Sequence, residues 1–177
     1  PVSLARLPRV YVYPMPERFV PGIYSPIRQS DMYAAEIAVT TRLLRSPLRT
    51  MKPETADLFF VPFFSSQILH AAPLRNGSGG SSARPDVDFG ATFDAALEAL
   101  HHIQHDYPHW NQTGGSDHVW MATHDIGAFL LPNAVAKSSI ILQHLGDTDD
   151  ESSETQCKRT CLLLRKAPGT SLALLRR

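Results

Sequence analysis

The stretch DLFFVPFF, residues 57–64, decides the fold of this chain. It is short, almost continuously apolar and rich in aromatic residues, which is typical of a strand buried on both faces of a parallel sheet. Pro62 cannot donate a backbone hydrogen bond to a neighbouring strand, so we expect the strand to end near it. The sequence therefore predicts a sheet that is covered on both sides.

Three other segments have strand patterns. Each is short and apolar. Between them, apolar residues recur at helical spacing, which predicts two helices and a helix-like connection. The expected strands are residues 9–13, 118–123 and 139–143, and the expected helices are residues 31–45, 91–105 and, for the connection, 127–137. Strands that alternate with helices predict an α/β fold with a Rossmann-like parallel sheet and flanking helices.

The helical patterns also predict which residues face the sheet. Asp31 is the expected N-cap of the first helix, and Pro47 follows its end. On the second helix, Phe93, Leu97 and Leu100 recur on one side. Gln104 could belong to the same side.

The overall charge of the chain argues against a nucleic-acid partner. The 177 residues include 17 Lys and Arg and 17 Asp and Glu, so the formal net charge is zero. No basic arm or acidic tail points to nucleic acid or to an anionic membrane surface as a partner. Hydrophobic residues make up 43% of the chain, which is enough for a globular core and argues against a disordered chain.

The composition changes after residue 146. Residues 147–156 (DTDDESSETQ) are acidic and polar without periodicity, and residues 157–177 are basic and Leu-rich. We expect a folded domain over residues 1–146 and a poorly ordered segment over residues 147–177.

Histidines gather at the end of the second predicted helix. His101 and His105 are four residues apart and share a helical face, which is a metal-like spacing. No third ligand is specified, and His near a helix C-terminus is favoured by the helix dipole. We therefore predict no metal site in this chain.

Three blocks of sequence resemble one known family. The first block lies between residues 33 and 62 and contains YAAE, SP, RT, PE and ADLFFVP. The second block, residues 110–127, contains WN, GG, DH, HD and a final G. The third block is SIIL at residues 139–142, followed by Gly146. Together they resemble the exostosin family, glycosyltransferase family 47. The chain departs from the family pattern at Gln112, where Arg is common, and at Ile126, where Trp is common. The resemblance covers residues 9–146.

The resemblance implies that the chain is the N-terminal, acceptor-side half of a GT-B-type, two-domain glycosyltransferase. Such an enzyme moves a sugar from a nucleotide-sugar to a glycan acceptor with inversion. The nucleotide-sugar is expected on a second domain outside this chain, so no cofactor is assigned here. The resemblance also implies the Golgi lumen, a membrane anchor outside the chain, and pairing in a homodimer or a heterodimer with another glycosyltransferase. The alternative is a non-catalytic carbohydrate- or partner-binding module derived from such an enzyme.

His124 and Asp125 are the preferred catalytic pair. They follow a predicted strand, and ligands of open α/β sheets gather at the carboxyl ends of strands. A carboxylate beside an imidazole can fix its tautomer and raise its basicity, as a general base requires. The alternative is that both side chains cap the segment that follows. Asp117 and His118 are weaker catalytic candidates, because an Asp-His pair at a strand entrance often satisfies turn amides.

Three further residues are candidates for substrate binding. Tyr33 and Glu36 lie one turn apart on the first helix and could face a cleft together, or could be a buried tyrosine and a surface glutamate. Arg49 could bind an acceptor group, or could pair with a nearby acid such as Glu54 or Asp57.

Two sequons permit N-glycosylation. Asn76-Gly77-Ser78 lies in a Gly/Ser-rich stretch, and Asn111-Gln112-Thr113 precedes two glycines. We expect both asparagines to be accessible to solvent, with Asn76 the better acceptor because Trp110 beside Asn111 favours burial.

Overall fold

The computed structural model describes residues 7–23, 34–70, 88–143 and 163–165. These residues form a six-stranded sheet in the order β2-β1-β3-β4-β5-β6. The first five strands are parallel, and β6 pairs antiparallel with β5. The strands are β1 (Val10–Val12), β2 (Arg49–Thr50), β3 (Leu58–Phe60), β4 (His118–Ala122), β5 (Ile140–Gln143) and β6 (Leu163–Arg165). The predicted Rossmann-like parallel sheet is confirmed.

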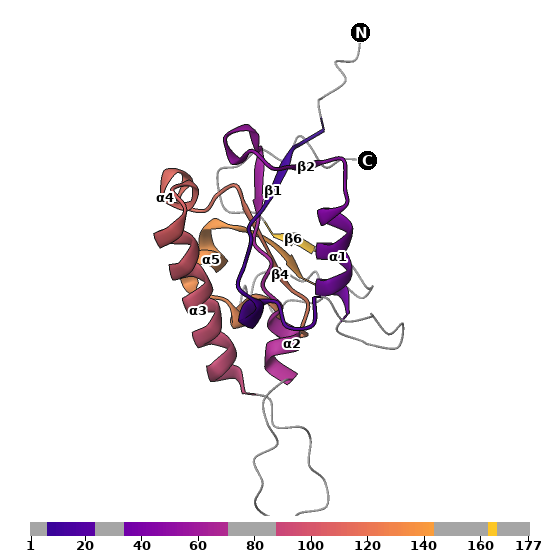
Figure 1. Cartoon of the computed structure of the whole chain (residues 1–177). Helices are drawn as coiled ribbons and strands as arrows, with labels where there is room; N and C mark the ends of the chain where they lie inside the picture. Colours follow the sequence, from indigo (N-terminus) through magenta and orange to yellow (C-terminus); the bar gives the residue numbers. More distant parts are fainter. Residues whose placement is uncertain (1–6, 24–33, 71–87, 144–162, 166–177) are drawn as a thin grey trace, which may run out of the picture.

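Helices cover both faces of the sheet. Figure 1 shows α1 on one side and α3 and α5 on the other. The α-helices are α1 (Ala35–Leu44), α2 (Ser65–His70), α3 (Phe89–Asp106), α4 (His109–Thr113) and α5 (Asn133–Ser138), and the 3-10 helices are η1 (Glu17–Phe19), η2 (Pro53–Thr55) and η3 (Gly127–Leu130). The chain winds from β1 through α1 to β2 on one face and from β3 through α2, α3 and α4 to β4 on the other.

The sheet separates a large core from a smaller one. The large core lies under α3 and contains Trp120, Phe59 and Ile103 with other buried residues. The smaller core lies under α1 and contains Val12 and Met121. The alternation of the strand side chains between these two cores explains why β4 is buried along its whole length.

The strand predicted over residues 57–64 is shorter than expected. β3 ends at Phe60, and α2 starts soon afterwards at Ser65. Pro62 lies between them, as the sequence predicts for the end of a strand. The strand β2 and the helices α2 and α4 were not predicted, because each has six residues or fewer and too few apolar positions to show a period.

Phe93, on the predicted apolar side of the second helix, does not lie in the core. That side chain is 38% exposed, whereas Ala96, Ala99 and Ile103 are fully buried. α3 is long and packs closely on the sheet through its alanines, so the small side chains mark the contact face and the large aromatic one points outward.

The second sequence block surrounds the entrance to β4. α4 ends at Gly114, whose φ of 62° is left-handed, and Gly115 follows with a φ of 85°. A Cβ on Gly115 would lie 2.5 Å from the Trp110 ring. The two glycines therefore turn the chain tightly under Trp110 and into β4.

The segment expected to be poorly ordered, residues 147–177, lies mostly outside the described residues. Its described part is β6, which extends the sheet beyond β5.

Candidate functional site

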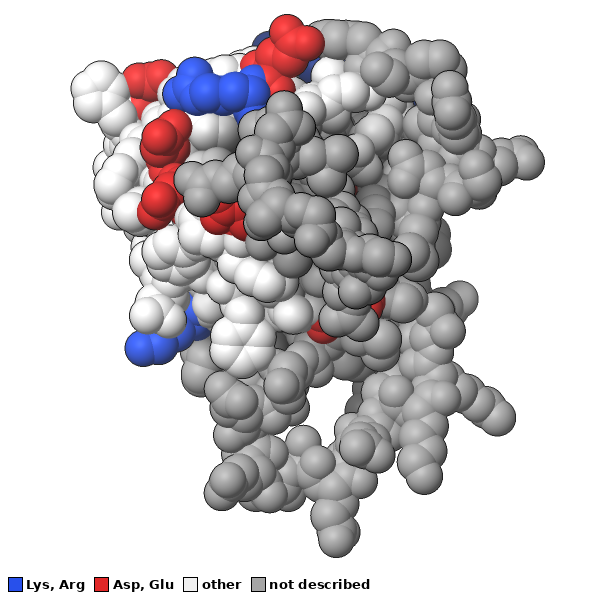
Figure 2. All heavy atoms as spheres, turned by 90° about the horizontal axis from the view of Figure 1, so that it is seen from below, with Lys and Arg blue, Asp and Glu red and all other residues white. Residues whose placement is uncertain are grey.

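The carboxyl ends of β1, β3, β4 and β5 meet at one edge of the sheet, the lower edge in Figure 1. Figure 2 looks at this edge from below, where Asp and Glu side chains lie among uncharged ones on the described surface and Lys and Arg side chains lie near its outline. The strand order reverses between β1 and β3, because the chain leaves β1 towards β2 and leaves β3 towards β4. Ligands of open α/β sheets bind outside the strand ends at such a point.

Glu36 is the centre of a hydrogen-bonded cluster at this edge. Its Oε1 accepts hydrogen bonds from Ser65 Oγ (2.8 Å), Ser66 N (3.2 Å) and Thr123 Oγ1 (3.1 Å). Ser66 N also lies 3.2 Å from Oε2, and Ser66 Oγ lies 3.0 Å from Thr123 Oγ1. We call these four residues the Glu36 cluster. It ties the start of α1 to the start of α2 and to the residue after β4.

The carboxyl group of Glu36 is completely buried. Burial raises the pKa of Glu36 to about 7, and the hydrogen bonds from Ser65, Ser66 and Thr123 limit the rise because they favour the charged form. The interpretation of Glu36 as a surface glutamate is wrong. A carboxyl group with a pKa near neutrality at a ligand-binding edge is a candidate functional residue.

His124 and Asp125 follow directly from this cluster. His124 is partly buried, and its Nδ1 accepts a weak hydrogen bond from the backbone N of Ile126 at 3.4 Å. Its ring lies 5.7 Å from the His70 ring and 6.5 Å from the Phe89 ring, centroid to centroid. Asp125 is exposed. Both residues lie at the edge where the sequence places a catalytic pair, and their catalytic role stays a prediction.

Asp117 and His118 lie at the opposite end of β4. His118 is completely buried, its Nδ1 lies 2.8 Å from Asp117 Oδ1, and its Nε2 lies 2.9 Å from the Tyr13 hydroxyl. Thr113 Oγ1 donates a second hydrogen bond to Asp117 at 2.7 Å. Burial acts to raise the pKa of Asp117, but the hydrogen bonds from His118 and Thr113, together with the electrostatic effect of His118, outweigh it and hold the pKa below its usual value. The arrangement supports a structural role for the pair.

Of the predicted substrate-binding residues, Tyr33 lies outside the described residues. Arg49 is half-buried, and its Nη1 donates a hydrogen bond to the backbone oxygen of Leu44 at 3.0 Å. Arg49 therefore caps the C-terminal end of α1, where a cation is favoured by the helix dipole.

Asn76, the preferred glycan acceptor, also lies outside the described residues. Asn111 is exposed, as expected, and its Nδ2 donates a hydrogen bond to Gln104 O at 3.0 Å. Trp110 beside it is buried. Glycosylation of both asparagines stays a prediction.

Two of the histidines of α3 contact a carboxylate. His102 Nδ1 and His105 Nδ1 lie 2.8 Å and 2.6 Å from the two oxygens of Asp106. Within the described ranges, no group of three or more His, Cys, Asp and Glu side chains is arranged to hold a metal ion. None of the described helices is long and apolar enough to cross a membrane.

Sequence reasoning missed Ser65, Ser66 and Thr123 as members of the site. A signal for them was available, since Ser65 and Ser66 come shortly after the buried strand β3 and Thr123 comes directly after β4. Carboxyl ends of parallel strands meet at one edge, so polar residues at these positions are expected to converge.

The fold and the site define a class of protein: a doubly wound α/β domain whose candidate ligand-binding edge contains a buried carboxyl group. The family model of the exostosin GT47 domain matches residues 5–161, and the chain belongs to this family. No solved structure matches the chain.

Three plant relatives are similar to more than two thirds of the chain. A probable glucuronoxylan glucuronosyltransferase of Arabidopsis thaliana is 31% identical over 78% of this chain and 30% of its own length. A probable β-1,4-xylosyltransferase of Arabidopsis thaliana is 34% identical, and a probable glucuronosyltransferase of Oryza sativa subsp. japonica is 31% identical, each over 68% of this chain and 26% of its own length. The chain thus spans less than a third of the length of each of these relatives.

Proposed function

We propose that this chain is the acceptor-side domain of a glycosyltransferase that builds a plant-type cell-wall glycan related to xylan. The observation that carries the proposal is the family match over residues 5–161, together with the place of its HD motif. That motif, His124-Asp125, lies at the carboxyl end of the central strand β4, next to the Glu36 cluster. The names of the relatives support a xylose- or glucuronic-acid-containing product.

In this proposal, His124 and Asp125 serve the proton transfer. The acceptor hydroxyl must lose a proton as its oxygen attacks the anomeric carbon and the nucleotide diphosphate leaves. Asp125 is exposed and His124 is partly buried beside the ring of Phe89, so both are open to an acceptor at this edge. Glu36 is buried and does not face the acceptor. It acts as a positioning residue, because Thr123, which it holds, is the neighbour of His124.

The nucleotide-sugar is proposed to bind to a second domain. Departure of a diphosphate needs positive charge or backbone N–H groups aimed at one place. The acidic side chains at this edge, the exposed Asp125 and the buried Glu36, would instead repel a diphosphate when they are ionised. We propose the Golgi lumen as the location, a glycan as the acceptor, and a homodimer or a heterodimer with another glycosyltransferase as the assembly.

The test is a transfer assay on the longest expressed polypeptide that contains this chain. Radiolabelled UDP-xylose and UDP-glucuronic acid serve as donors, and xylo-oligosaccharides serve as acceptors. We expect label in the oligosaccharide fraction with one of the two donors. The proposal fails if neither donor labels any acceptor while the protein is folded and binds the donor in calorimetry.

A further inference from the structure

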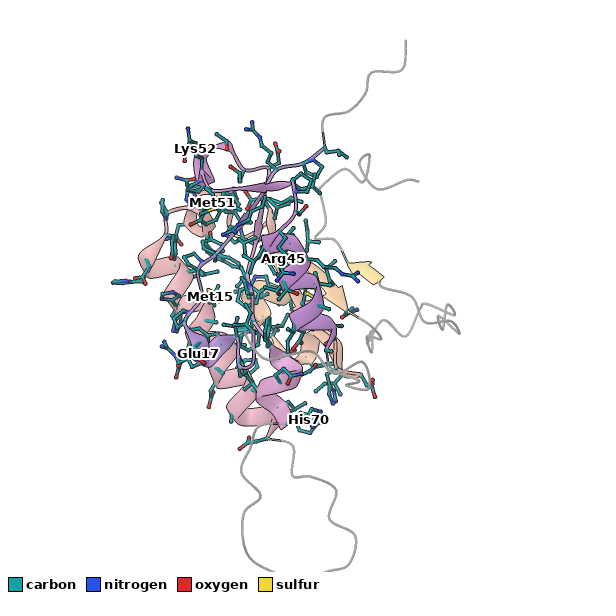
Figure 3. The ribbon with its side chains drawn as sticks, turned by 45° about the vertical axis from the view of Figure 1, so that its right-hand side comes forward. Met15, Glu17, Arg45, Met51, Lys52 and His70 are labelled. Carbon is teal, nitrogen blue, oxygen red and sulfur yellow. The ribbon has the colours of Figure 1, made fainter. Side chains whose placement is uncertain are left out.

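A cavity of about 270 Å³ lies between α1 and the segment that follows β1. Its walls include Val12 at the end of β1, Met15 in the segment that follows, Thr40 and Leu44 from α1, and Arg49 from β2. Figure 3 shows Met15 on the segment that leaves β1. Pro62, which follows β3, also lines the cavity, so the cavity reaches the point between β1 and β3 where the strand order reverses, near which ligands of open α/β sheets bind.

Two polar atoms of the cavity-lining residues have no hydrogen bond within the described part of the chain. They are Thr40 Oγ1 and Arg49 Nε, and Thr40 is completely buried. By contrast, the hydroxyl of the neighbouring Thr41 has a hydrogen-bond partner within α1, because Thr41 Oγ1 donates to the backbone oxygen of Ile37 at 2.8 Å. A buried polar atom without a partner is costly, and a ligand that supplies the partner recovers that cost.

The surroundings favour a neutral ligand over an anion. The Arg49 guanidinium already donates to Leu44 O at the C-terminal end of α1, which carries partial negative charge. Glu17, an exposed acidic residue, also lines the cavity and adds negative charge near it. A hydroxyl can accept from Arg49 Nε and donate to Thr40 Oγ1 or to Glu17, whereas a second carboxylate would be repelled by Glu17.

The remaining walls are mostly aliphatic, and they suit the C–H faces of a sugar ring. The volume lies just below the range of about 300–1,000 Å³ of typical ligand pockets, so it holds a single ring rather than a chain. Thr40 also lies one helical turn from Glu36 on α1, so a ring bound here is a neighbour of the Glu36 cluster.

We propose that this cavity is a subsite for one neutral pyranose residue, which hydrogen-bonds to Arg49 and Thr40. The subsite rests on the proposed function, in which the ring belongs to the glycan acceptor. Thr40 Oγ1 and Arg49 Nε are both screened from solvent, so binding includes a small rotation of these side chains towards the ring.

The test follows the side-chain Nε–H resonance of Arg49 by NMR in the ¹⁵N-labelled 177-residue chain. The probe is methyl β-D-xylopyranoside, a neutral ring, and D-glucuronate is the anionic comparison. We expect a saturable shift of the Arg49 resonance with the xyloside and weaker binding of glucuronate. The absence of a saturable shift, or tighter binding of the anion, overturns the proposal.

Two isosteric variants separate recognition from folding. Thr40→Val removes the unpartnered hydroxyl and is expected to weaken xyloside binding about 3- to 10-fold, the effect of one hydrogen bond. Thr41→Val is the matched control, because its hydroxyl bonds within α1, and it should bind the xyloside like the unmodified chain. Thermal unfolding establishes that both variants fold. Equal binding by Thr40→Val and the unmodified chain overturns the proposal.

The readout does not depend on a donor or on transfer. Binding in the cavity without any transfer contradicts the proposed enzyme activity alone. If the protein transfers sugar but its Arg49 resonance does not shift with the xyloside, the result contradicts the proposed subsite alone.

Discussion

Replacement of Glu36 by Gln should change the pH dependence of stability. Gln is close in shape to the protonated carboxyl group and stays uncharged at every pH. Its amide oxygen can take the position of Oε1, which accepts the hydrogen bonds from Ser65, Ser66 and Thr123. The substitution therefore preserves most of the cluster and removes the cost of burying a negative charge.

The magnitude follows from the pKa of Glu36, which burial raises from 4.5 to about 7. Because the folded pKa lies above the unfolded one, the folded chain binds the proton more tightly between these values. The stabilisation that this proton provides is complete below pH 4.5 and is lost as the pH rises through 7. At about 1.4 kcal/mol per pH unit, the loss amounts to about 3 kcal/mol between pH 4 and pH 8.

The assay is urea unfolding of the unmodified chain and of Glu36→Gln between pH 4 and pH 8, followed by the fluorescence of the buried Trp110 and Trp120. We expect the free energy of unfolding of the variant, relative to the unmodified chain, to rise by about 3 kcal/mol over this range. Glu54→Gln, which changes an exposed carboxylate, is the control and should show no such rise. A difference between Glu36→Gln and the unmodified chain that stays constant with pH would refute the reasoning.

Three further predictions test other parts of the structure. Gly115→Ala should destabilise the fold by at least twice as much as Gly114→Ala in urea unfolding, because both carry a left-handed penalty of about 1 kcal/mol but only Gly115 lies against Trp110; equal losses would contradict this packing. His124→Ala should lower turnover of the transferring polypeptide about 10²- to 10⁴-fold with little change in acceptor binding. The control is His105→Ala, which changes an exposed histidine and should leave turnover unchanged. Wild-type turnover in His124→Ala would assign a structural role to that residue. The 177-residue chain by itself should bind acceptor without transferring sugar, and labelled product from the purified chain in the donor assay would show that the donor site lies within it.

Much of the fold could be predicted from local patterns. The strands β1, β3, β4 and β5 and the helix α1 lie within the segments whose periodicity predicted them, and α3 covers its predicted segment, residues 91–105, and extends beyond it at both ends. Their long or strongly apolar patterns report burial directly. The short elements β2, α2 and α4 could not be predicted, because they are positioned by the elements around them rather than by their own periodicity.

The site was predicted only in part for a related reason. The position of His124 and Asp125 follows from β4 and from the rule that ligands gather at the carboxyl ends of strands. The burial of Glu36 does not follow from the helix pattern, in which a glutamate normally marks the solvent face. It requires Ser65 and Thr123, which are 29 and 87 residues away in the sequence.

The sequence by itself determined the fold class, the family and the edge of the sheet that carries the candidate site, because these depend on apolar periods and on contiguous motifs. Only the tertiary structure decided that Glu36 is buried with a raised pKa, that His118 is buried, and that a cavity lies between α1 and the segment that follows β1. These properties arise where separate segments meet. Burial and hydrogen bonding act through space, so no local pattern encodes them.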